Sequence, residues 1–143
     1  MSFKKDKYKI IKKAIDKKLC KFLFDYFLNR RYLTYILFNH KYINPSETML
    51  GAFGDGQVPE TFSIYSDIVF ETLLQDIKPM MEKETEMKLY PNYSYARLYK
   101  KGDVLKRHKD RMACDISTTL NLGGQPWPIY LDPTGKEGKK GVK

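Results

Sequence analysis

Cysteine is scarce in this sequence, and long apolar runs are absent from it. The two cysteines, Cys20 and Cys114, are too few for a disulfide framework and do not have the CxxC spacing of a zinc site. No apolar run approaches the roughly 20 residues of a membrane span. No apolar signal-peptide core follows the basic N-terminus either. We therefore expect a cytoplasmic protein with two reduced thiols and no membrane partner.

The composition is that of a globular protein, and the charge is unevenly distributed along the sequence. Hydrophobic residues make up 42% and aromatic residues 14% of the 143 residues, enough for the core of one domain. The net charge is +9. Lys and Arg outnumber Asp and Glu by 12 to 3 in residues 1–41 and by 11 to 5 in residues 97–143, whereas the ratio is 3 to 9 in residues 42–96. The basic first segment could bind nucleic acid or form the solvated face of a helix. We favour the helix face and expect no specific nucleic-acid partner.

Residues 1–91 are predicted to form a helical support region. Asp16 is a suitable N-cap for a long helix, which can continue to Leu37. After this cap, apolar residues recur at the spacing of a helix face that packs on a core: Leu19, Phe22, Leu23, Tyr26 and Phe27. Residues 44–63 hold three glycines and two prolines and are predicted to be a loop.

A second helix is predicted to follow this loop. Ser66 or Asp67 can cap it, and its apolar positions run to Ile77. Pro79 is expected to kink or end the helix, although the residues after it could resume helical structure.

Residues 92–143 have the character of strands. Large and small residues alternate with period two in residues 93–99, which predicts a strand that ends in a turn at residues 100–103. Three further strands are predicted over residues 104–108, 115–122 and 127–131. Helices followed by a run of strands are typical of an α+β domain, and we expect a single domain.

The tripeptide His108-Lys109-Asp110 is the candidate metal site. Non-haem Fe(II) oxygenases bind iron with two histidines and one carboxylate, and the remaining positions stay open for a co-substrate and dioxygen. In a strand, residues i and i+2 point the same way, so His108 and Asp110 could supply two of these three ligands. By itself the tripeptide is a weak signal, because an exposed polar turn with an incidental histidine has the same sequence.

The residues around the tripeptide carry a more specific pattern. An aromatic strand and a glycine turn precede it in the arrangement Tyr95-x-Arg97-x-Tyr99-x-x-Gly102-x-x-Leu105-x-x-His108-x-Asp110. This segment resembles the 2-oxoglutarate/Fe(II) dioxygenases of the prolyl-hydroxylase superfamily, in particular the small forms of marine phages and bacteria. The resemblance spans roughly residues 50–132 and is most specific in residues 95–124.

The resemblance implies a fold and a set of roles. The N-terminal helices would pack on the first half of a double-stranded β-helix, or jelly roll. His108 and Asp110 would bind Fe(II), while Tyr99 and Thr119 would face the carboxylate of the 2-oxoglutarate co-substrate, with ascorbate as an accessory reductant. Tyr99 could equally be a core aromatic residue and Thr119 an ordinary strand residue. Arg111 and Cys114 match the family without a chemical role that the sequence assigns.

The sequence also departs from the family pattern. The family has a second histidine late in the barrel and, one strand later, an Arg or Lys that pairs with the distal 2-oxoglutarate carboxylate. No histidine follows Gly124, and His40 lies in the helical region, where we expect a structural or surface role. We therefore expect a fragment of such an enzyme, incomplete at the C-terminus.

Three functions stay open at this point. The first is a fragment of a dioxygenase that hydroxylates a peptidyl proline and converts 2-oxoglutarate to succinate and CO2. The second is an AlkB-type nucleic-acid demethylase, which shares the Tyr-x-x-Gly and His-x-Asp layout. The third is a non-catalytic binding protein built on half of the barrel, whose open strand edges would need a covering partner. We favour the first, with a peptide or protein as its substrate.

Overall fold

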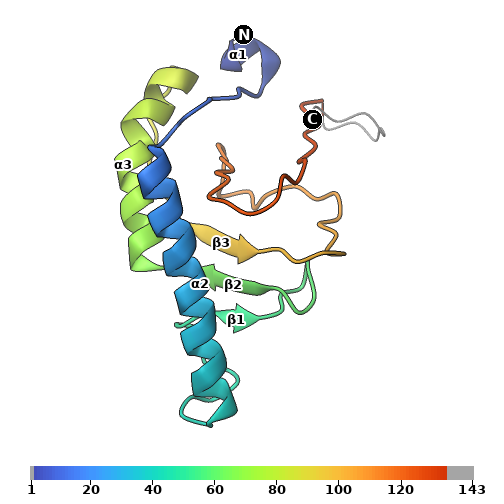
Figure 1. Cartoon of the computed structure of the whole chain (residues 1–143). Helices are drawn as coiled ribbons and strands as arrows, with labels where there is room; N and C mark the ends of the chain where they lie inside the picture. Colours follow the sequence, from blue (N-terminus) through green and yellow to red (C-terminus); the bar gives the residue numbers. More distant parts are fainter. Residues whose placement is uncertain (1, 135–143) are drawn as a thin grey trace.

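The computed structural model describes residues 2–134 of the chain. Residues 135–143, the end of the predicted strand region, lie outside this range. Two long helices stand side by side against a small sheet, and a long irregular segment follows the last strand (Figure 1). A short helix, α1 (Phe3–Asp6), precedes them and was not predicted from the sequence. The mixed helix and sheet content confirms the α+β class.

Helix α2 (Lys17–Asn39) begins where its cap was predicted. The Asp16 carboxylate accepts a hydrogen bond from the backbone nitrogen of Lys18 at 2.7 Å. Leu23 and Phe27 are buried on its inner face, as expected. Phe22 is 62% exposed, so the prediction that it packs on the core was wrong. The buried stripe is narrower than the apolar pattern and leaves the Phe22 side of the helix in solvent.

Helix α3 (Ile68–Thr85) begins at Asp67, whose carboxylate accepts from the backbone nitrogen of Val69 at 3.0 Å. Pro79 lies inside the helix and does not end it. A proline removes a single intrahelical hydrogen bond, and the residues after Pro79 continue the helix for almost two turns. The helix ends at Glu86, which adopts the left-handed conformation of a C-cap.

The sheet has three antiparallel strands in the order β1 (Ala52–Phe53), β2 (Phe62–Tyr65) and β3 (Tyr95–Leu98). Strand β3 confirms the strand predicted over residues 93–99. The prediction of a loop throughout residues 44–63 was wrong, because β1 and the first half of β2 lie within it. Phe62 pairs with both Phe53 and Leu98, so β2 is the central strand.

The strands predicted over residues 104–108, 115–122 and 127–131 are not formed. Within residues 99–134 the structure has turns and irregular backbone, with one isolated bridge residue, Leu131. Alternating side chains make a segment suitable for a strand, but a strand also needs a neighbouring edge with which to pair. No such pairing extends the sheet beyond β3 in the described part of the chain. The sheet is therefore smaller than a jelly roll.

The core lies between the two long helices and the sheet (Figure 1). Phe27 of α2 is central to it: its ring lies 5.4 Å from the ring of Phe62 and 5.6 Å from that of Phe70, the latter edge to face. Leu23 and Ile64 complete the buried cluster. The aromatic contacts join α2, α3 and β2, so β3 and the segment after it are held by a rigid support.

Candidate functional site

The predicted iron ligands His108 and Asp110 lie on the irregular segment that follows β3. The Nε2 atom of His108 is 3.6 Å from Oδ1 of Asp110, and the two side chains are 35% and 51% exposed. Two donors that are each ~2.1 Å from one metal ion are ~3–3.5 Å apart at ordinary coordination angles. The two side chains therefore face each other at close to the separation that a shared metal requires.

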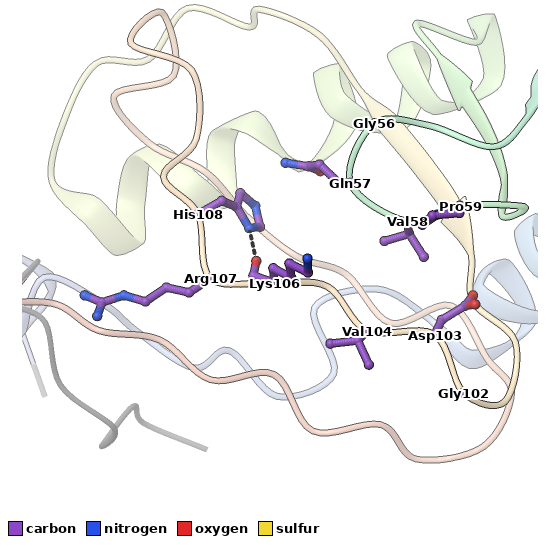
Figure 2. Close-up of a pocket in the computed structure, with 10 residues that line it drawn as sticks. All are labelled: Gly56, Gln57, Val58, Pro59, Gly102, Asp103, Val104, Lys106, Arg107 and His108. Carbon is purple, nitrogen blue, oxygen red and sulfur yellow. Dashed lines mark hydrogen bonds between the residues drawn. The ribbon is translucent and has the colours of Figure 1, made fainter.

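A backbone contact selects one tautomer of the neutral His108 ring. Its Nδ1 atom is 2.8 Å from the carbonyl oxygen of Lys106 (Figure 2). A carbonyl oxygen can only accept, so Nδ1 carries the hydrogen and Nε2 of the neutral ring keeps its lone pair. Histidines that bind metals commonly donate their other ring N–H to a carbonyl in this way. The donor set of a neutral imidazole and a carboxylate fits a metal such as Fe(II).

A third ligand is not brought to this pair within residues 2–134. No group of three or more His, Cys, Asp and Glu side chains in that range could hold a metal ion. His40 ends α2, and its ring stacks near that of Tyr42 with centroids 6.1 Å apart. The C-terminal end of α2 lies far from the segment after β3 (Figure 1). His40 is therefore remote from His108, as a structural or surface residue would be.

The two predicted co-substrate residues have different surroundings. The Tyr99 hydroxyl accepts a hydrogen bond from Nη1 of Arg97 at 3.0 Å, and its ring packs on Trp127 with centroids 4.0 Å apart. Thr119 is exposed. Among the described residues, no hydrogen bond, ion pair or ring contact joins Tyr99 or Thr119 to His108 or Asp110. Their role towards 2-oxoglutarate stays a prediction.

A cleft of about 560 Å³ opens beside His108. Its walls come from residues 56–59 of the loop between β1 and β2, from the turn at residues 102–104 and from residues 106–108 (Figure 2). The volume lies within the range of about 300–1,000 Å³ typical of ligand sites. His108 thus belongs both to the candidate metal pair and to the wall of a cleft that could hold a substrate.

A polar network that sequence reasoning missed fixes one wall of this cleft. Arg97 of β3 bonds to Asp55 through Nη2 at 2.6 Å and through Nε at 2.9 Å, and the Tyr95 hydroxyl donates to the same carboxylate oxygen at 2.7 Å. Arg97 Nη2 also donates to Oε1 of Gln57 at 2.8 Å. The network ties the loop at residues 55–57 to the sheet.

The pKa values of the two charged groups reflect this network. Burial alone would raise the pKa of Asp55, but hydrogen bonds from the backbone of Val58, from Tyr95 and from Arg97 outweigh burial and lower it. Burial alone would lower the pKa of Arg97, but contacts with Tyr99, Tyr95 and Asp55 outweigh burial and raise it. The ion pair is therefore charged throughout the ordinary pH range. The shared face of Tyr95, Arg97 and Tyr99 was the available sequence signal.

Arg111, which had no role assigned from the sequence, packs the segment that carries His108 and Asp110 against the sheet. Its guanidinium carbon lies 5.8 Å from the ring centroid of Tyr65 and 5.3 Å from that of Tyr93. These two rings stack with centroids 4.8 Å apart. A hydrogen bond with Cys114, together with burial, raises the pKa of the Tyr93 hydroxyl. Arg111 and Cys114 thus hold the residues that flank Asp110 against β2 and the lead into β3.

No family model, curated protein or solved structure matches this chain. The helices of residues 2–134 include none that is both long and apolar enough to cross a membrane.

Proposed function

We propose that this chain carries the first two iron ligands of an Fe(II)- and 2-oxoglutarate-dependent dioxygenase. The substrate would be a peptide or protein, and a C–H bond of a proline or similar residue would be hydroxylated. The main support for the proposal is that Nε2 of His108 lies 3.6 Å from Oδ1 of Asp110, while Nδ1 of the same ring lies 2.8 Å from the Lys106 carbonyl oxygen. This arrangement coincides with the residues that the family resemblance selects.

Each residue of the proposed site would have its own role. His108 and Asp110 would hold the metal, and the Lys106 carbonyl would keep the imidazole in the tautomer that binds it. Tyr99 and Thr119 would contact the carboxylate of 2-oxoglutarate. Bound iron would supply the activation of dioxygen that accompanies decarboxylation of 2-oxoglutarate to succinate and CO2, with ascorbate as an accessory reductant.

The proposal extends to the fold and the compartment. In the proposed enzyme, β1, β2 and β3 would belong to a double-stranded β-helix. The protein would act in the cytoplasm, in line with Cys20 and Cys114, both of which are free thiols. We propose no nucleic-acid partner. Lys21, one of the lysines on the basic helix, already pairs with Asp25 at 2.5 Å, which suits a solvated helix face.

The test is an anaerobic titration with Fe(II), and with Co(II) as its coloured substitute. We expect weak binding by the wild-type chain and by the control His40→Ala. We expect at least a ~10-fold loss in His108→Ala and in Asp110→Ala, since changes to outer partners of a metal site alone cost ~10–100-fold. Equal binding by all four proteins would contradict the proposal.

A further inference from the structure

We propose that the cleft beside His108 binds a peptide in which a carboxylate side chain lies next to a small apolar residue. This inference deepens the proposed function and rests on it for the peptide nature of the ligand. Its support is the chemistry of the cleft walls, which present apolar surface together with hydrogen-bond donors that have no acceptor within the described residues.

The apolar part of the cleft comes from two separate segments. Pro59 and Val104 are both exposed there, Val104 by 65%, and Val58 is buried beneath them. Figure 2 shows Pro59 and Val104 on opposite walls, the first from the loop and the second from the segment after β3. A small apolar side chain, such as a proline ring, could cover both and remove their surface from water.

The polar part of the cleft offers donors. The Oε1 atom of Gln57 is occupied by Arg97 Nη2 at 2.8 Å, which leaves the amide nitrogen to donate. Figure 2 shows this nitrogen turned towards the His108 side of the cleft. It also shows the Lys106 side chain directed towards the loop that carries Val58. Within residues 2–134, neither Nε2 of the Gln57 side chain nor the Lys106 ammonium group has a hydrogen-bond or ion-pair partner.

The other charged groups of the cleft do not compensate Lys106. The Asp103 side chain is only 6% exposed, and its carboxylate already accepts from the Thr61 hydroxyl at 2.9 Å and from the Lys100 ammonium group at 2.7 Å. Arg107 points away from the cleft and pairs with Asp132 at 2.6 Å (Figure 2). The charge presented to a ligand is therefore positive, which favours a carboxylate as the acceptor.

Size and layout favour a peptide over a free dicarboxylate. A free acid that satisfied Lys106 and Gln57 would leave the Pro59 and Val104 surfaces in water. A dipeptide segment such as Glu-Pro could reach both parts of a cleft of about 560 Å³.

The test measures fluorescence anisotropy of labelled tetrapeptides with the full chain in metal-free buffer. The peptides are Ala-Glu-Pro-Ala, Ala-Gln-Pro-Ala and Ala-Lys-Pro-Ala, capped at both ends. We expect the glutamate peptide to bind best and the glutamine peptide to bind roughly three- to tenfold more weakly, because an exposed charge-assisted contact is worth roughly that much. Lys106→Gln should remove this preference and Gln57→Ala should weaken the glutamate peptide. The matched control Lys109→Gln, on an exposed neighbour that does not line the cleft, should change neither.

Several results would overturn the inference. These are no binding of the glutamate peptide, equal binding of all three peptides, an equal effect of Lys109→Gln and Lys106→Gln, or displacement of the peptide by 2-oxoglutarate or succinate at similar concentration. The metal titration is a separate measurement. Loss of the peptide preference with metal binding intact rejects only the peptide site, whereas peptide binding by a chain that binds no metal rejects the proposed function.

Discussion

The hydroxyl of Tyr26 on α2 lies 2.9 and 2.7 Å from the two carboxylate oxygens of Asp67, the residue that caps α3. The same carboxylate, only 5% exposed, also accepts from the Val69 backbone and lies 3.4 Å from Nη2 of Arg30. One side chain therefore starts a helix and joins it to its neighbour. This joint between Tyr26 and Asp67 fixes the two helices against which the sheet packs, and the sheet in turn leads into the candidate site.

Tyr26→Phe should destabilise the fold. The substitution removes the hydroxyl and leaves the buried Asp67 carboxylate with fewer donors, which costs about 1–3 kcal/mol of unfolding free energy. Urea denaturation followed by circular dichroism measures this loss. Tyr32→Phe is the matched control, because Tyr32 lies on the same helix and is 64% exposed. Equal stability of the two variants would show that the joint contributes nothing.

The same joint should make stability fall at high pH. Burial, together with the hydrogen bond and charge of Asp67, raises the pKa of Tyr26 from 10.0 to about 12. The folded state then holds a proton that the unfolded state has lost, so this contribution is full below pH 10 and disappears as the pH rises to about 12. Denaturation at several alkaline pH values should show the decline, and Tyr26→Phe should flatten it. Parallel curves for both proteins would contradict the assignment.

Arg97→Ala should be more disruptive than the loss of a surface ion pair. Its guanidinium and the Asp55 carboxylate are 9% and 17% exposed, so the variant leaves a largely buried carboxylate without its cation. We expect a loss of ~3 kcal/mol, at the lower end of the range for buried pairs. Lys21→Ala breaks the exposed pair with Asp25 and should cost less than ~1 kcal/mol.

Because the pKa of Asp55 is low, the Arg97 network stops stabilising the fold only in strong acid. Its folded-state pKa lies below the ordinary 3.8, so the stabilisation is present above that pH and is lost as the pH falls through the lowered value. Asp55→Asn should therefore lose stability at neutral pH and show a weaker decline in acid than the wild type. A steeper acid decline in the variant would contradict this account.

The 143-residue chain should not turn over 2-oxoglutarate by itself. His108 and Asp110 would supply two ligands where the proposed class of enzyme uses three, and the described residues bring no further His, Cys, Asp or Glu to them. Succinate formation with Fe(II), ascorbate and oxygen should equal that of the buffer control. Release above that control, abolished by His108→Ala and retained in His40→Ala, would show that two ligands from this chain are enough.

The sequence predicted those features that depend on neighbouring residues. The caps at Asp16 and Asp67, and the alternation that became β3, are local patterns, and the structure has all three. The strands expected after Tyr99 depended on a pairing edge, and local alternation does not reveal whether that edge exists. Loop composition also concealed β1 and part of β2, whose pairing is set by the strands beside them.

The candidate site also has features that the sequence predicted and features that it could not predict. His108 and Asp110 are two residues apart, so their proximity could be anticipated from the motif. The contact between Asp55 and Arg97 joins positions 42 residues apart, and it depends on the register that places the loop beside β3. The charge of the cleft likewise depends on which cations are already paired, a property that composition does not show.

The pairing of β2 with β3 has a consequence for the order of folding. Ser63 lies opposite Arg97, and the whole of α3 lies between them in the sequence. Closing a loop of this length costs entropy before any pairing energy is gained. Formation of α3 fixes the conformation of 18 of the intervening residues, so that only the segment between Thr85 and Tyr95 still has to fold back along the helix to reach β2. We therefore expect β3 to join the sheet late, after α2 and α3 have docked, so that the cleft is completed in the last steps of folding.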